Sequence, residues 1–115
     1  MIGEQDVRAI IGQYEKFGWE IHCVLITDEL RKHLGEAVSN LFDNARIETS
    51  DIDAARFTRP STGGRVAWEL RRLSELPYAL IAVVEKNIDT VELAEVLRDK
   101  EDDLRERVNK APPAA

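Results

Sequence analysis

A group of charged side chains and one imidazole is the part of this sequence that could do chemistry. Its candidate members are His22, Arg56, Glu69 and Arg71, which come from three segments with strand-like alternation. An imidazole changes its charge near neutral pH, and guanidinium and carboxylate groups recognise ligands of opposite charge through strong hydrogen bonds. The four residues therefore predict a ligand-binding site, provided that their strands place them on one face of a sheet.

Strand alternation supports that placement. If the apolar residues Phe57, Trp68 and Leu80 share the covered face of a sheet, the neighbouring charged residues point to the other face. Arg56 and Glu69 can then stand directly opposite each other in a hairpin. Three interpretations of this polar face stay open: a solvated face stabilised by charge pairs, a contact surface for a partner or second subunit, and a ligand or catalytic site.

A second arrangement pairs Asp53 with Glu69 on the next strand, which is how magnesium-dependent nucleases hold their metal. Such sites usually have a lysine two positions after the glutamate. That position here is Arg71, and arginine stays protonated and cannot act as a base. Phosphodiester cleavage is therefore the weaker alternative, and we predict no metal site.

The cysteine and histidine content argues against zinc and thiol chemistry. One cysteine, Cys23, and two histidines do not supply the paired ligands of a zinc site. Cys23 directly follows His22, and adjacent strand residues point to opposite faces, which argues against a catalytic thiol–imidazole pair. We expect a buried, inert thiol and no bound cofactor. A lone cysteine in an apolar run also fits a reducing cytoplasm.

The elements that must position these residues alternate between helical and strand periodicity. The apolar residues predict, in chain order, helix 4–17, strand 19–26, helix 27–42, strands 55–58, 66–71 and 78–85, and helix 89–108. Residues 45–50 are ambiguous. This order predicts an α+β fold: a two-layer sandwich in which an antiparallel sheet of about four strands has three helices packed on one face.

We expect one domain over residues 1–109 and a disordered tail at residues 110–115. Two features of that domain indicate a contact surface. Apolar Ala79, Ile81 and Val83 fall on the second face of the sheet, where an exposed patch would favour association. The second half of the last helix, residues 98–110, is so rich in charge that we expect it to project into solvent or to meet another subunit.

Composition argues against several classes of function. A net charge of −6 disfavours nonspecific nucleic-acid binding and attachment to an anionic membrane. No apolar run reaches the ~18 residues of a membrane span, and the N-terminus lacks a secretory signal pattern. We therefore expect a small cytoplasmic interaction or regulatory protein that acts by binding rather than catalysis, on a protein partner or a second copy of itself. The alternative is a small-ligand-binding protein or enzyme that uses the polar sheet face.

Overall fold

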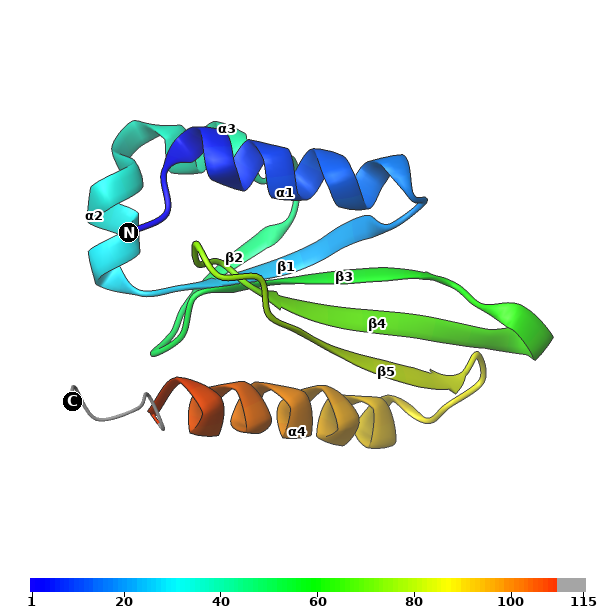
Figure 1. Cartoon of the computed structure of the whole chain (residues 1–115). Helices are drawn as coiled ribbons and strands as arrows, with labels where there is room; N and C mark the ends of the chain where they lie inside the picture. The colour runs from blue at the N-terminus through cyan, green and yellow to red at the C-terminus, as the bar shows by residue number, and fades with distance from the viewer. Residues whose placement is uncertain (110–115) are drawn as a thin grey trace.

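The chain folds into a mixed sheet with helices against both faces (Figure 1). The structure is a computed structural model that describes residues 1–109. Its elements in chain order are α1 (Glu4–Lys16), β1 (Glu20–Ile26), α2 (Asp28–Leu34), η1 (Gly35–Ala37), α3 (Val38–Leu41), β2 (Arg46–Thr49), β3 (Ala54–Pro60), η2 (Thr62–Gly64), β4 (Arg65–Arg72), β5 (Ala79–Glu85) and α4 (Thr90–Asn109). None of the helices in the described range is long and apolar enough to cross a membrane.

The predicted α+β class is confirmed, with a sheet that is larger and less uniform than expected. Within residues 1–109 the sheet has five strands in the order β2-β1-β3-β4-β5. The additional strand, β2, comes from the segment that the sequence left ambiguous, and it pairs with β1 in parallel. A parallel neighbour requires a crossover connection, which α2, η1 and α3 supply between β1 and β2.

The first core lies between the sheet and the helices α1, α2 and α3. In α1, Val7 and Ile11 are spaced four residues apart and both are buried. Thr27 caps α2, because its hydroxyl accepts a hydrogen bond of 3.1 Å from the backbone N–H of Leu30. Phe57 of β3 is fully buried in the same core and fixes the place where α1 crosses the sheet.

The last helix packs against the opposite face, which corrects the expectation that all helices share one face. Leu104 of α4 is fully buried in a second core with Leu25 of β1 and Leu70 of β4. Figure 1 shows α4 on the side of the sheet away from α1. The central strands bury apolar side chains on both faces, and each apolar sheet face needs a covering layer.

The register of β3 and β4 differs by one residue from the predicted one. Phe57 stands opposite Glu69, and Arg56 stands opposite Leu70. Phe57 therefore faces α1 whereas Trp68 lies on the α4 side, so the expectation that both share one face is wrong. A slip of one residue moves every side chain of a strand to the other face. Because both faces of this sheet hold apolar residues, alternation alone could not select the register.

The second half of α4 is tied to the sheet, which corrects the expectation that it projects away. Arg56 of β3 donates to the carboxylate of Glu101 in an ion pair, and the arginine side chain is only 7% exposed. Nearer the end of the helix, Arg105 donates to the carboxylate of Asp51 at 2.7 Å. Two charged residues of α4 that we expected to face solvent or another subunit therefore form ion pairs, Glu101 with Arg56 in β3 and Arg105 with Asp51 before it.

The apolar residues expected on an uncovered part of the sheet are exposed. Ile81 is 54% exposed and Val83 is 47% exposed, on the face of β5 that α4 does not cover. Ala79 is exposed beside them. The interpretation of residues 1–109 as a single domain stays a prediction, and the tail predicted at residues 110–115 lies outside the described residues.

Candidate functional site

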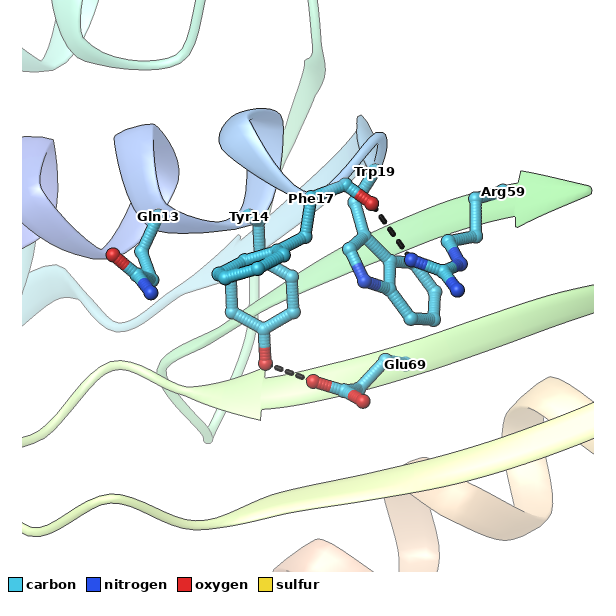
Figure 2. Close-up of a pocket in the computed structure, with 6 residues that line it drawn as sticks. All are labelled: Gln13, Tyr14, Phe17, Trp19, Arg59 and Glu69. Carbon is cyan, nitrogen blue, oxygen red and sulfur yellow. Dashed lines mark hydrogen bonds between the residues drawn. The ribbon is translucent and has the colours of Figure 1, made fainter.

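An aromatic pocket lies where the C-terminal end of α1 meets β3 and β4 (Figure 2). Its volume is 440 Å³. The lining residues come from α1, the turn after it and the two strands, and they are Gln13, Tyr14, Phe17, Trp19, Arg59 and Glu69. Three aromatic rings and three polar side chains thus face one opening, which is the usual make-up of a small-ligand site.

The end of α1 places the aromatic walls. Gly18 adopts φ +86°, a conformation that glycine enters without steric cost, and the chain reverses there. The backbone N–H of Trp19 then donates to the carbonyl of Tyr14 at 3.1 Å, which brings Trp19 beside the last turn. The rings of Tyr14 and Trp19 meet edge to face, with centroids 5.9 Å apart, and Tyr14 stacks on Phe57 at 4.0 Å. These contacts hold the pocket wall rigidly on the first core.

The floor of the pocket holds a carboxylate that has no cationic partner. The hydroxyl of Tyr14 donates a hydrogen bond to Glu69, whose side chain is partly buried on β4. Among residues 1–109, no lysine or arginine nitrogen comes within 4.0 Å of the Glu69 carboxylate. Burial, together with the hydrogen bond to Glu69, raises the pKa of Tyr14 far above its usual range. Tyr14 is therefore a permanent donor, and Glu69 keeps acceptor capacity for a ligand.

The rim of the pocket holds the opposite charge. Arg59 donates to the backbone carbonyl of Phe17 at 2.7 Å, and its guanidinium lies 5.0 Å from the centre of the Trp19 ring. Figure 2 shows the hydrogen bond from Arg59 to the Phe17 carbonyl beside the Trp19 ring. Because Arg59 stands opposite Ala67, it is a diagonal neighbour of Glu69 on the same face, with Cβ atoms roughly 7–8 Å apart. The two charges face one pocket without pairing with each other.

The structure divides the four site residues that the sequence singled out. Glu69 and Arg71 share the α1 face, but only Glu69 lines the pocket. Arg71 is partly buried and donates to the backbone carbonyl of Arg72. Arg56 lies on the other face, where it pairs with Glu101 and donates to Cys23 Sγ at 3.3 Å. The predicted Arg56–Glu69 pair therefore does not form, because the register differs by one residue.

His22 lies away from the aromatic pocket, at an irregularity of β1 between Ile21 and Cys23. Its ring meets Trp68 edge to face with centroids 4.9 Å apart. The pKa of His22 is lowered, mainly because burial removes water from the ring and to a smaller extent because Arg56 and Arg46 are positively charged. His22 lines a second hollow of 320 Å³, which lies at the start of β1.

The Cys23 thiol is buried, and Asp53 and Glu69 each accept a hydrogen bond from a different part of the chain. Cys23 is 1% exposed, as expected for a buried thiol, and burial raises its pKa. Asp53 accepts a hydrogen bond of 2.7 Å from the backbone N–H of Thr27. Asp53 precedes β3 and lies four positions from the residue opposite Glu69, about 13 Å along the strand. The structure therefore does not bring Asp53 and Glu69 together, and the described residues contain no group of three or more His, Cys, Asp or Glu side chains arranged to hold a metal.

Sequence reasoning missed most of the pocket. Tyr14 and Phe17 fall within the predicted helix 4–17, and Trp19 begins the predicted strand 19–26, so none of the three was predicted to line a site. The signal that could have found them is the group of three aromatic residues around Gly18, since a glycine that ends a helix reverses the chain and gathers neighbouring side chains. Arg59 gave no signal, because its role depends on the β3–β4 register.

Comparison of the chain with protein-family models, curated proteins and solved structures gives no match.

Proposed function

We propose that this protein acts by binding rather than catalysis, and that its ligand is a small zwitterion with an apolar body, such as a free amino acid. The observation that carries the proposal is the pair of opposite charges, Glu69 and Arg59, which face one aromatic pocket and do not pair with each other. An ammonium group fits the open acceptor positions of Glu69. A carboxylate fits the remaining donors of Arg59, whose guanidinium has five N–H groups.

The positions of the two charges support one ligand that contacts both. Glu69 and Arg59 are diagonal neighbours on one face and line the same pocket. The ammonium and carboxylate of an α-amino acid are attached to one carbon, and each can form a charge-assisted hydrogen bond. The rings of Phe17 and Trp19 then offer apolar contact to its side chain, and Phe17 is 58% exposed without a ligand.

The titratable groups of the pocket favour recognition over chemistry. The raised pKa of Tyr14 keeps its phenol protonated at neutral pH, so it serves as a donor that orients Glu69 rather than as a base. Glu69 is held by Tyr14 of α1 and Arg59 by the carbonyl of Phe17 just after that helix, and such preorganisation is typical of a binding site. A regulatory role in a reducing cytoplasm remains our expectation, and the buried Cys23 is compatible with it.

The test is calorimetric titration with three related probes: L-phenylalanine, 2-phenylethylamine and 3-phenylpropanoate. The first has both charges, the second only the ammonium, and the third only the carboxylate. We expect L-phenylalanine to bind at least about tenfold more tightly than either of the others, since each charged contact adds free energy. Glu69→Gln should weaken L-phenylalanine and 2-phenylethylamine while leaving 3-phenylpropanoate unchanged, and Arg59→Gln should give the reverse pattern.

Matched controls are Glu85→Gln and Arg65→Gln, which remove the same charges from exposed positions outside the pocket. These variants should bind all three probes like the wild type. Equal affinity of the three probes, equal effects of Glu69→Gln and Glu85→Gln, or the absence of binding up to millimolar probe would overturn the proposal.

A further inference from the structure

The outer strand β5 presents an unused row of backbone hydrogen-bonding groups. It is the last strand of the sheet, and among residues 1–109 no strand pairs with its outer side. The backbone N–H of Lys86 donates to Gly64, and that of Arg72 donates to the carbonyl of Tyr78, so the even-numbered residues of this segment bond to β4. The odd-numbered residues, Ala79, Ile81, Val83 and Glu85, therefore point their N–H and C=O groups outward.

The two edges of the sheet differ in how they discourage further pairing. The opposite edge strand, β2, has four residues, and its exposed Arg46 and Glu48 form an ion pair at 2.9 Å. Short length and charge are the usual protections of an edge strand. In contrast, β5 has seven residues and no charge before Glu85, and Ile81 and Val83 lie exposed along it. The β5 edge lacks the protection that the β2 edge has.

We infer that β5 pairs in antiparallel fashion with β5 of a second copy of this chain, around a two-fold axis at Ala82. In this register all seven residues of the strand find a partner, with Ile81 opposite Val83 of the second copy and Ala79 opposite Glu85. Every outward-pointing residue then meets another outward-pointing residue. The pairing satisfies about eight backbone groups of each copy, because each of the four odd residues contributes one donor and one acceptor.

Residues at the ends of the strand select this register. Pro77 has no N–H and cannot extend the pairing beyond Ala79 on one side. On the other side the strand ends at Glu85, where the chain turns toward α4. The symmetric register also keeps the two copies of Glu85 apart, since each faces the uncharged Ala79. Exposed Ile81 and Val83 become cross-strand apolar neighbours, which stabilises such a pair.

This dimer is independent of the proposed ligand site, which lies on β4 and α1 rather than on the outer side of β5. Its test is sedimentation equilibrium from low micromolar to submillimolar protein. We expect a mass that rises with concentration from 13.0 kDa toward twice that value. Val83→Lys should weaken the dimer at least about tenfold, because it places a charge opposite Ile81 on each side of the axis. The matched control is Val91→Lys on α4, where the wild-type side chain is 64% exposed, and it should leave the dimer unchanged.

A cysteine trap reports the register. In the symmetric pairing the two Ala82 Cα atoms are about 4.5 Å apart, within the range that a disulfide requires. Ala82→Cys should therefore form a covalent dimer under mild oxidation, whereas Val91→Cys should not, and the native Cys23 is too buried to interfere. A mass of 13.0 kDa at every concentration, or equal cross-linking of the two cysteine variants, would overturn the inference.

Discussion

At the scale of single residues, the placement of charge relative to the sheet decides what each carboxylate does. Glu69 and Glu101 are both partly buried acids that meet a residue from a distant part of the chain. Glu101 meets a cation, Arg56, and the pair joins α4 to β3. Glu69 meets a phenol, Tyr14, which organises the carboxylate but leaves its charge uncompensated. The first arrangement serves stability and the second is available for binding.

The Tyr14–Glu69 contact predicts a loss of stability at high pH. The pKa of Tyr14 is raised above its usual value of 10.0 in the folded protein. Above about pH 10 the unfolded chain therefore loses a proton that the folded chain keeps, and the free energy of unfolding falls with pH by up to about 1.4 kcal/mol per pH unit. Below pH 10 both states are protonated and this stabilising effect is fully present.

The measurement is urea unfolding of the wild type and Tyr14→Phe between pH 8 and pH 12. We expect the wild type to lose more stability than Tyr14→Phe over this range, because phenylalanine has no proton to lose. Parallel pH profiles for the two proteins would show that Tyr14 titrates normally.

The buried pair of Arg56 and Glu101 predicts strong coupling. Arg56→Met leaves Glu101 with Arg105 alone, 3.7 Å away, and should cost about 3–5 kcal/mol, whereas the double variant Arg56→Met/Glu101→Leu should recover most of that loss. Urea unfolding of the two single variants and the double variant measures the coupling. The exposed pair of Arg8 and Glu4 lies outside this network and is the comparison, and Arg8→Ala should cost less than about 1 kcal/mol. Additive losses at Arg56 and Glu101 would contradict the account.

At the scale of elements, the two faces of the sheet are covered by different parts of the chain. The N-terminal helices cover β1 and β3 on one side, and α4 covers the other. Because α1 packs over β1 and β3, the same face of the edge strand β5 stays open, and the aromatic pocket forms at the border between covered and open sheet.

Packing of α4 through its second half predicts an uneven sensitivity to truncation. Leu104 is fully buried, and Leu104→Ala should cost about 2–5 kcal/mol, whereas Val91→Ala near the start of the helix should stay within about 0.5 kcal/mol of the wild type. Urea midpoints at an unchanged slope give both values. A comparable loss at the two positions would mean that the whole helix packs evenly.

The elements were predictable from the sequence, and their mutual placement was not. Periodicity is a local property, so most helices and strands lie close to their predicted positions, but the helix predicted at 27–42 is broken at Gly35, where φ is +61°, into α2, η1 and α3. The β3–β4 register depends on which apolar face is buried, and β5 has apolar residues on both faces: Leu80 and Val84 on one side, Ile81 and Val83 on the other. The burial of Arg56 depends on Glu101, which lies 45 residues away in the sequence. Glu69 was predicted because it alternates with the apolar Trp68 and Leu70, whereas the place of Arg59 follows from the register alone.

At the scale of the whole molecule, two proposed contacts share one hairpin. Glu69 on β4 lies in the pocket, and its cross-strand neighbour Ile81 lies on the open edge strand β5. A ligand in the pocket therefore contacts β4, and a second copy contacts the outer edge of the neighbouring strand β5. Ligand binding is tested with the Glu69→Gln and Arg59→Gln variants alone, because Val83→Lys places an ammonium on the same face, at a diagonal neighbour of Glu69.

The most direct test of the central claim is an amide and indole NMR titration of the wild-type protein with L-phenylalanine. We expect shifts confined to the aromatic pocket: the indole N–H of Trp19 and the amides of Gln13, Tyr14 and Glu69. Shifts centred on the second hollow at His22, or an unchanged spectrum at millimolar ligand, would contradict the assignment of this pocket as the binding site.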